Sequence, residues 1–253
     1  MLSWIKIDFV KAILAIALSI CFVLFSSVGF TQVNKFYAEL SVGPSFPIGK
    51  FANKDYMDSS AGFATLGVAA NVSFGYQLNN KISVLFSIGG SQHAQDEEAR
   101  ELKGGPGMGG SVTTDVDAEK WKAIKLMLGA RLSSPVSFPG KISFYTDISA
   151  GICKTAIPEY SGIVYVNNML SGSFTYGEIK LPWSFCYQIG AGLKYGLNEK
   201  IYLVGNLNYF DSAPVHHGMK NINPPNPAGP YAPFETKYHL STINVSVGAG
   251  IYF

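Results

Sequence analysis

Several stretches of the chain alternate between apolar and polar residues with a period of two. Between Gly62 and Leu78 the even positions carry mostly apolar side chains, and the odd positions carry small or polar ones. Because successive side chains of a β-strand point to opposite sides, this alternation predicts a strand with one apolar and one polar face. The stretch from Lys237 to Phe253 alternates in the same way up to its last residue.

The same period predicts eight strands separated by turn residues. They are Phe36–Ser45, Gly62–Leu78, Ile82–Ser91, Lys120–Ser133, Ile142–Ile157, Pro182–Leu197, Ile201–Phe210 and Lys237–Phe253. Alternating segments of about ten residues between turns are typical of a barrel that crosses a membrane with its strands. The sequence therefore predicts an all-β fold, an eight-stranded antiparallel up-and-down transmembrane β-barrel. Strand-like segments within Ser161–Tyr176 leave a ten-stranded barrel open, but we expect them to form a hairpin above the membrane.

Three short turns end in the dipeptide Lys-Ile. Tyr76–Ile82 and Tyr195–Ile201 share the pattern Tyr-x-Leu-Asn-x-Lys-Ile, and Lys141 precedes Ile142 at the third turn. The other connections are long and cover 46–61, 92–119, 154–181 and 211–236. In outer-membrane barrels short turns face the periplasm and long loops face the outside. The alternation of short and long connections therefore predicts that both ends of the barrel chain lie in the periplasm.

The composition agrees with a membrane environment. Hydrophobic residues make up 47% of the chain and charged residues only 14%, against about a quarter charged in a typical soluble domain. After residue 30 there is no apolar run of about 18 residues, which excludes membrane-spanning helices from that part. A net charge of +2 gives no basic face for nucleic acid, so we expect no nucleic-acid partner. A soluble lipocalin-like barrel is the alternative class.

The first 30 residues have the organisation of an export signal. Lys6 and Lys11 precede an apolar stretch from Ala12 to Phe25, and small residues follow up to Gly29. This order predicts a secretory signal peptide in residues 1–30 that is cleaved, which leaves a barrel domain in residues 31–253. A retained membrane anchor is the alternative, but the apolar stretch is shorter than the roughly 20 residues that span a bilayer.

Five charged residues fall on the inward faces of predicted strands. An eight-stranded barrel is only wide enough for side chains to fill its interior, and charges there are costly unless they are paired. We therefore expect one network of ion pairs, formed by Glu39, Lys125, Arg131, Asp147 and Lys194. Structural filling of the lumen is the favoured interpretation. A narrow channel, gated when these pairs exchange partners, is the alternative.

Two cysteines fall on neighbouring predicted strands. Cys153 and Cys186 both lie on the predicted inner face near the outer rim, and the strand limits place them about opposite each other. The periplasm permits disulfides, and the Cα atoms of opposite residues come within bridging distance. A disulfide between Cys153 and Cys186 is therefore a hypothesis, which a register shift of two residues would remove.

The export signal, the eight strands, the loop asymmetry and the C-terminal Ile251-Tyr252-Phe253 together resemble the small OmpA- and OmpX-like outer-membrane β-barrels. The resemblance implies that alternate C-terminal residues form a signal for the barrel-assembly machinery. These residues are Val247, Ala249, Ile251 and Phe253. The resemblance also implies outer-membrane lipid and lipopolysaccharide as surroundings, and an extracellular ligand for the long loops.

A second resemblance concerns His239 and Ser241, whose His-x-Ser spacing is similar to that of lipid A deacylases. The predicted last strand puts both residues on its lipid-facing side. A serine nucleophile needs a base and a third group that orients the base, and Glu235 is the nearest acidic residue in the sequence. Hydrolysis of lipid A is therefore an alternative. The favoured function is non-enzymatic, without metal or cofactor: adhesion, ligand binding or envelope integrity through the external loops.

Overall fold

The computed structural model of the protein describes residues 35–55, 58, 60–101, 112–134, 142–167, 169–218 and 235–253. The expected signal peptide in residues 1–30 lies outside these ranges. Residues Phe36–Tyr252 form one compact unit. No helix in the described part of the chain has the length and apolar character needed to cross a membrane.

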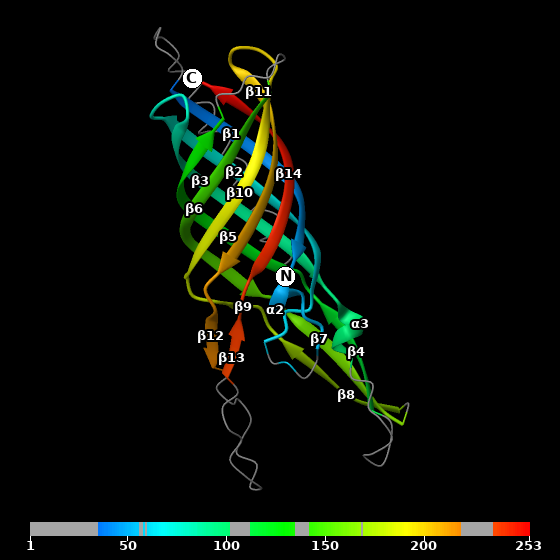
Figure 1. The fold of residues 1–253 in the computed structure, drawn as a ribbon. Helices are drawn as coiled ribbons and strands as arrows, with labels where there is room; N and C mark the ends of the chain where they lie inside the picture. Colours follow the sequence, from blue (N-terminus) through cyan, green and yellow to red (C-terminus); the bar gives the residue numbers. More distant parts are fainter. Residues whose placement is uncertain are drawn as a thin grey trace, which may run out of the picture. The chain divides into compact units, whose positions relative to one another are not determined.

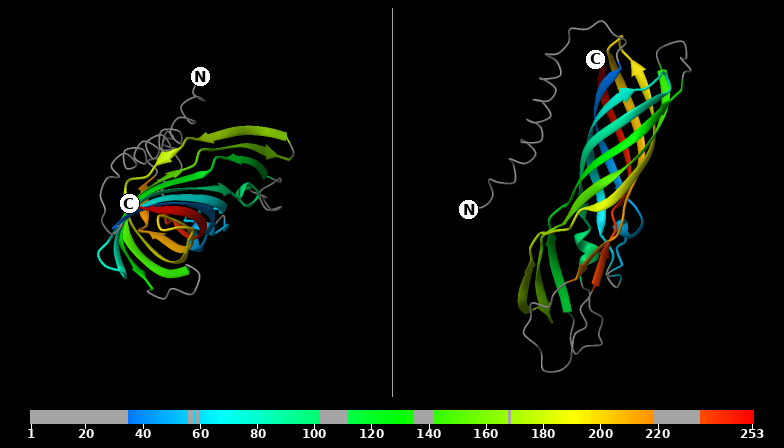
Figure 2. Two further views of the ribbon diagram at one scale, coloured as in Figure 1. Left: turned by 90° about the horizontal axis from the view of Figure 1, so that it is seen from above. Right: turned by 90° about the vertical axis from the view of Figure 1, so that its left-hand side faces the viewer.

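Eight long antiparallel strands close into a barrel (Figure 1). They are β1 (Phe36–Pro47), β2 (Ala64–Gln77), β3 (Ile82–Gln95), β5 (Trp121–Ser133), β6 (Ile142–Ile157), β10 (Ser184–Gly196), β11 (Ile201–Ser212) and β14 (Ser241–Tyr252). Each barrel strand pairs with the next along the chain, and β14 pairs with β1 to close the ring. Figure 2 shows the strands winding obliquely around the lumen. The predicted fold class is confirmed.

The two faces of the barrel wall differ as the alternation predicts. On β1 the outward side chains Phe36 and Leu40 are each 59% exposed, whereas Glu39 on the inward face is 6% exposed. Exposed apolar side chains continue around the wall and include Leu66, Val68, Phe86, Leu128, Phe144, Ile148, Ile189, Leu207, Val245 and Val247. A closed sheet satisfies its backbone hydrogen bonds internally, as a hydrocarbon environment requires. The outer surface of the barrel therefore fits the interior of a bilayer.

Asparagine side chains hold the two short turns that the structure describes. Asn79 Oδ1 accepts hydrogen bonds of 2.9 Å from the backbone N–H groups two and three residues later. Asn198 does the same at 2.9 and 2.7 Å. Asparagine is favoured in turns because its side chain bonds the backbone two residues on. The asparagine thus explains why the Tyr-x-Leu-Asn-x-Lys-Ile pattern recurs, while Lys141 at the third turn lies outside the described residues.

A second sheet extends from the end of the barrel opposite these turns. It consists of β4 (Val112–Ala118), β7 (Tyr160–Val166) and β8 (Met169–Tyr176), in the order β4-β7-β8. The hairpin expected within Ser161–Tyr176 is β7 with β8, and β7 pairs with β4 rather than with a barrel strand. The barrel therefore has eight strands and not ten. β4 lies inside a connection for which the sequence predicted no strand.

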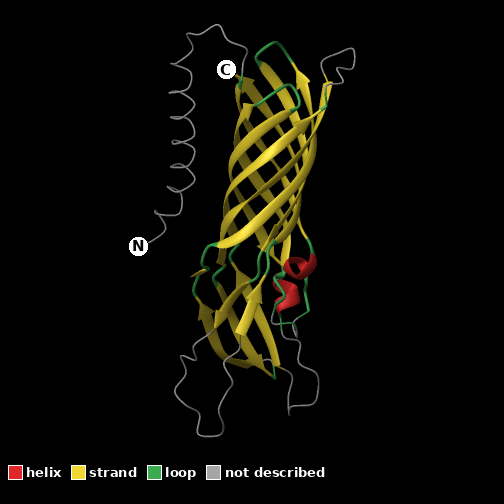
Figure 3. Cartoon of the chain, turned by 60° about the vertical axis from the view of Figure 1, so that its left-hand side comes forward, coloured by secondary structure: helices red, strands yellow, loops and turns green. Residues whose placement is uncertain are grey.

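The remaining elements are short and also lie at this loop end (Figure 3). They are α2 (Gly49–Ala52), α3 (Glu97–Arg100), β9 (Ile179–Lys180), β12 (Val215–Gly218) and β13 (Glu235–Tyr238). The stretch predicted as one last strand is therefore two, β13 and β14, separated by His239 and Leu240. The interruption has a physical reason: Leu240 turns into the buried core, and its backbone N–H bonds the Ser212 hydroxyl at 3.0 Å.

Apolar side chains fill the loop end of the barrel. The buried cluster consists of Phe51, Ala64, Trp121, Met127, Cys153, Ile157, Leu181, Cys186, Phe210 and Leu240. The rings of Phe51 and Trp121 meet edge to face with centroids 5.5 Å apart, and Trp121 Nε1 donates to the Gly62 carbonyl at 2.8 Å. Phe51 reaches the cluster from α2, so the first external loop folds back into the mouth of the barrel.

An ion pair joins the first two external loops above this cluster. Lys54 Nζ lies 2.5 Å from Asp96 Oδ2, and the Asp96 side chain also accepts from the Ala99 N–H at 3.0 Å. The Lys54 ammonium and this capping bond lower the pKa of Asp96 below its usual value. Asp96 therefore keeps its charge, and the contact between the loops, down to a lower pH than a free carboxyl would.

Candidate functional site

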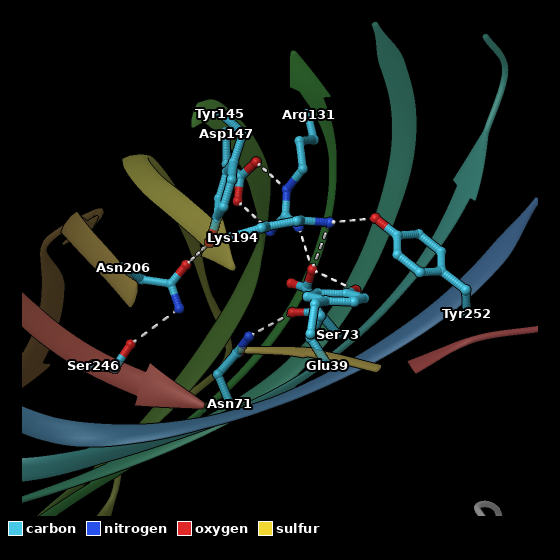
Figure 4. Close-up of polar contacts among 11 residues, drawn as sticks. Glu39, Asn71, Ser73, Arg131, Tyr145, Asp147, Lys194, Asn206, Ser246 and Tyr252 are labelled. Atoms are coloured by element: carbon cyan, nitrogen blue, oxygen red, sulfur yellow. Dashed lines mark hydrogen bonds and ion pairs between the residues drawn. The ribbon is translucent and has the colours of Figure 1, made fainter. Parts of the chain in front are cut away.

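Glu39 is the centre of the polar contacts inside the lumen (Figure 4). Arg131 Nη1 donates to Glu39 Oε1, Lys194 Nζ lies 3.0 Å from the same oxygen, and Tyr202 donates its hydroxyl to it at 2.9 Å. These partners come from β5, β10 and β11, so one carboxylate links three strands to β1. Buried charges are tolerated when they are paired and hydrogen-bonded in this way.

Arg131 extends the network to the second carboxylate. Its Nε and Nη2 donate to the two oxygens of Asp147 at 2.7 and 2.8 Å, a bidentate pair between directly opposite residues of β5 and β6. The guanidinium also lies over the Tyr145 ring, 3.9 Å from its centroid. The structure thus brings together four of the five charged residues that the sequence placed in the lumen.

Lys125 is the residue that does not join them. Its Nζ lies 2.5 Å from Gln188 Oε1 and 4.7 Å above the centroid of the Phe210 ring, both on the loop-end side of the network. Lys125 and Arg131 are six residues apart on one strand, which corresponds to about 20 Å. A single network of all five charges, as expected from the sequence, is therefore wrong for Lys125.

Three tyrosines close the lumen around the network by lying over glycines of neighbouring strands. The pairs are Tyr37 with Gly75, Tyr145 with Gly192, and Tyr202 with Gly250. A Cβ atom added at any of these glycines would approach an atom of the tyrosine ring to within 2.0–2.5 Å. The rings therefore need glycine opposite them. The lumen at this level is filled by aromatic rings and paired charges.

Cys153 and Cys186 are close but not opposite. Cys153 pairs with Ser184, and Cys186 pairs with Gly151, so the two cysteines are offset by two residues across β6 and β10. Both are free thiols with 0% exposure, and the Cys153 sulfur lies 3.2 Å from the Ser184 hydroxyl. The sequence predicted that the two cysteines lie directly opposite each other, and this prediction is wrong by two residues. A shift of that size weakens the disulfide hypothesis.

His239 and Ser241 meet a third residue that the sequence did not indicate, Asp211 on β11. His239 Nε2 lies 2.9 Å from Asp211 Oδ1, and the Ser241 hydroxyl donates to the same oxygen. Ser241 is only 5% exposed, so the lipid-facing position expected from the sequence is wrong. The hydroxyl bonds the carboxylate rather than the imidazole, whereas a serine nucleophile needs its hydroxyl on the base.

The C-terminal residues alternate along the outer face of β14. Val247 is 68% exposed and lies opposite Val42 of β1, and Ala249 and Ile251 follow at alternate positions opposite Leu40 and Ala38. Phe253 lies just beyond the strand. This row of apolar residues therefore lies beside the β1–β14 pairing that closes the barrel. Recognition of these residues by the barrel-assembly machinery stays a prediction.

The two edges of the external sheet differ in chemistry. On β4 the exposed side chains include Asp115 and Asp117, and the Ala118 N–H donates to the Glu97 carboxylate of α3 at 3.2 Å. β8 has no charged residue and no proline, and its side chains are exposed along nearly the whole strand. Met169 and Leu170 are 73% and 70% exposed. Among the residues that the structure describes, β8 is therefore an open edge, whereas charges and a helix cover β4.

Sequence reasoning found the charged lumenal residues but missed the tyrosine that bonds Glu39 and the carboxylate that contacts His239 and Ser241. Tyr202 and Asp211 both lie on β11, where the alternation assigns a face and no partner. The one usable signal is the combination of tyrosine on one strand with glycine on the next, as in Tyr145 and Gly192. Recognising it requires the register, which the sequence alone does not provide.

No known family model and no curated protein matches this sequence. Solved structures of similar fold include Neisserial surface protein A, at 12% identity over 86% of this chain and 97% of that one, with a TM-score of 0.44. Ail of Yersinia pestis has 13% identity, coverage of 87% and 99%, and a TM-score of 0.40. The N-terminal barrel domain of Pseudomonas aeruginosa OprF has 14% identity, coverage of 88% and 100%, and a TM-score of 0.35. These similarities concern the fold alone. By its own strand number, connectivity, closure and apolar exterior, the chain has the fold of the small OmpA- and OmpX-like outer-membrane β-barrels.

Proposed function

We propose that the protein is a non-enzymatic outer-membrane barrel that binds an extended segment of another polypeptide along the open edge of β8. It is exported through a cleaved signal peptide, and lipopolysaccharide surrounds its outer half. The barrel anchors the sheet, and the sheet makes the contact. The observation that carries the proposal is the difference between the edges of the β4-β7-β8 sheet.

Exposed strand edges pair with other chains unless charges, proline or a covering element prevent it. Two of these protective features are present at β4: the strand carries two aspartates, and helix α3 lies beside it. The edge at β8 has none of these among its residues. An extended peptide added to such an edge gains main-chain hydrogen bonds, and alternate side chains supply specificity. Met169, Phe174 and Tyr176 share one face of the strand, because the register shifts between Val164 and Tyr165, and they would contact apolar side chains of the partner.

The lumen argues for binding rather than transport. Ion pairs and tyrosines fill the turn-end half, and the apolar cluster fills the loop end. Eight strands leave room for side chains and little else. For the alternative of lipid A hydrolysis, Asp211 supplies a carboxylate beside His239. However, the Ser241 hydroxyl bonds that carboxylate and is buried. We therefore place the function on the external sheet.

The test uses the full protein in lipid nanodiscs and a displayed library of random ten-residue peptides. Selected peptides should protect the backbone amides of Ser171–Thr175 from hydrogen exchange. The double variant Ser171→Lys/Ser173→Lys places two charges on β8, as natural edges do, and should weaken binding at least tenfold. The matched control Thr113→Lys/Asp115→Lys places two lysines on β4 and should leave binding unchanged. Binding that survives the β8 variant, or protection confined to other loops, would refute the proposal.

A further inference from the structure

The second half of β8 offers a partner two faces of different chemistry. Gly172, Phe174 and Tyr176 lie on one face of the strand, and Ser173 and Thr175 lie on the other and are exposed. The alternation is regular here, because the register shift of the β7–β8 pairing comes before Gly172. None of these five residues carries a charge.

These five residues are complementary to a second copy of themselves. A symmetric contact places residue i opposite j and j opposite i, which on two strand edges is an antiparallel ladder. With Phe174 at its centre, Phe174 faces its own copy and Tyr176 faces Gly172. Ser173 then faces Thr175. Aromatic pairs and serine–threonine pairs are favourable across strands, whereas like charges opposite each other are not. An uncharged edge is therefore what such a symmetric contact requires.

The pairing of a tyrosine with a glycine is a contact that this protein already uses. In the barrel, Tyr145 lies over Gly192 of the neighbouring strand. A Cβ built on Gly172 would meet no atom of the described residues within 4 Å. The face of the sheet is therefore open at Gly172, and Tyr176 is 47% exposed. The Tyr176 ring of a second copy fits over this glycine as Tyr145 fits over Gly192.

The external sheet continues the direction of the barrel strands. The β5–β6 ladder ends at the pair of Lys122 with Ala156, and the β4–β7 ladder begins four residues further along both strands. Between the two ladders the Glu119 N–H donates to the Glu159 carbonyl at 2.8 Å. They thus form one ribbon without a register shift, which leaves the barrel at its loop end (Figure 3). Barrel strands are tilted about 35–45° from the barrel axis, so the sheet rises steeply from the membrane.

This steep direction determines how two paired copies are oriented. The twofold axis of an antiparallel strand pair is perpendicular to the sheet. Two copies in one flat membrane are related by an axis along the membrane normal, so their paired sheets would have to lie flat on the membrane. A steeply rising sheet instead places the axis close to the membrane plane. Rotation about such an axis turns the second barrel upside down, into a facing membrane.

We propose that β8 pairs with β8 of a second copy in a facing membrane, an inference that rests on the proposed function of this edge. The partner polypeptide is then the same chain, and the contact joins two membranes that carry it. A ladder of five residues on each side is weak by itself. Many copies on two facing surfaces bind together, however, which raises the overall affinity by about 10²- to 10⁴-fold.

The test uses phosphatidylcholine vesicles that carry the full protein, in two populations labelled with donor and acceptor dyes. Wild-type vesicles should dock to wild-type vesicles and not to protein-free ones. Ser173→Lys/Thr175→Lys and Ser173→Glu/Thr175→Glu should each dock to themselves about tenfold less, because like charges face each other. Mixing these two variants should restore docking, since lysine then faces glutamate. Thr113→Lys/Asp115→Lys on β4 is the matched control and should dock as the wild type does.

Several outcomes would overturn the contact between two copies. Docking to protein-free vesicles would make lipid the partner, and charge variants that dock to themselves, or that fail to dock when mixed, would exclude this register. If wild-type vesicles do not dock while selected peptides still protect Ser171–Thr175, the proposed function stands and this inference falls.

Heat-dependent gel migration shows whether each variant is folded. If the charge variants do not fold, hydrogen exchange of the wild type decides. The amides of Ser171–Thr175 should exchange more slowly in docked vesicles than in vesicles kept apart by dilution, and equal exchange rates refute the contact.

Discussion

Glu39 is the residue on which the lumenal network depends most. Its carboxylate contacts Arg131, Lys194 and Tyr202. The Asp147 carboxylate forms a bidentate pair with one of these residues, Arg131. Removing one partner of a buried ion pair leaves an uncompensated charge and costs about 3–5 kcal/mol. We expect Glu39→Gln to lower the free energy of unfolding by about that amount, measured by urea titration of the refolded barrel in detergent.

The control and the double variant give this measurement its meaning. Glu199→Gln changes an exposed glutamate in a short turn and should alter stability by no more than about 0.5 kcal/mol. Adding Lys194→Met to Glu39→Gln removes the cation left without a carboxylate, so part of the loss should return. A loss below about 1 kcal/mol for Glu39→Gln would show that lumenal water replaces the carboxylate.

At the scale of the strand, tyrosine–glycine pairs set how closely neighbouring strands pack around the lumen. A Cβ at Gly192 would lie 2.5 Å from the Tyr145 ring and from a β11 carbonyl oxygen. Overpacking of this kind costs about 1–3 kcal/mol, so Gly192→Ala should destabilise the barrel by that amount. Gly205→Ala is the matched control, because its Cβ would meet only Leu193 at 3.8 Å. Equal stabilities for the two variants in the same urea titration would contradict this account.

The strands also show what the sequence was able to predict. Period-two alternation located β6 to the residue and the other barrel strands to within a few residues, because one face must meet apolar surroundings and the other a polar lumen. The sequence did not predict β4, because β4 is a strand through its pairing with β7, which lies more than forty residues away. The offset of Cys153 from Cys186 was not predicted either, because alternation assigns each residue to a face but leaves the register between strands undetermined.

The candidate sites follow the same division. Glu39, Arg131, Asp147 and Lys194 were predictable as inward residues, since each falls on the polar face of its strand. Which charges meet depends on their height along the barrel. Lys125 lies too far toward the loop end to reach either carboxylate, and it bonds Gln188 and lies opposite Cys153 instead. Height follows from strand stagger, a property of the closed barrel as a whole.

At the scale of the whole molecule, the barrel is closed at two separate levels. The ion pairs and tyrosines occupy the end near the short turns, and the cluster around Phe51 and Trp121 occupies the loop end. An ion would have to displace both to cross. Phe51 reaches its position from α2 in a loop, so the loop-end closure is the one that a conformational change opens more readily.

Two closures in series predict an electrically silent protein. In planar bilayers the wild type should give no stepwise conductance, since side chains close the lumen at both levels. Phe51→Ala removes the plug contributed by the first loop, yet the network around Glu39 remains, so this variant should be silent as well. A porin inserted in the same bilayers is the positive control. Discrete steps in the wild type would contradict the closed lumen, and steps in Phe51→Ala alone would mean that the loop-end cluster is the single barrier and that the ion pairs rearrange to let ions pass.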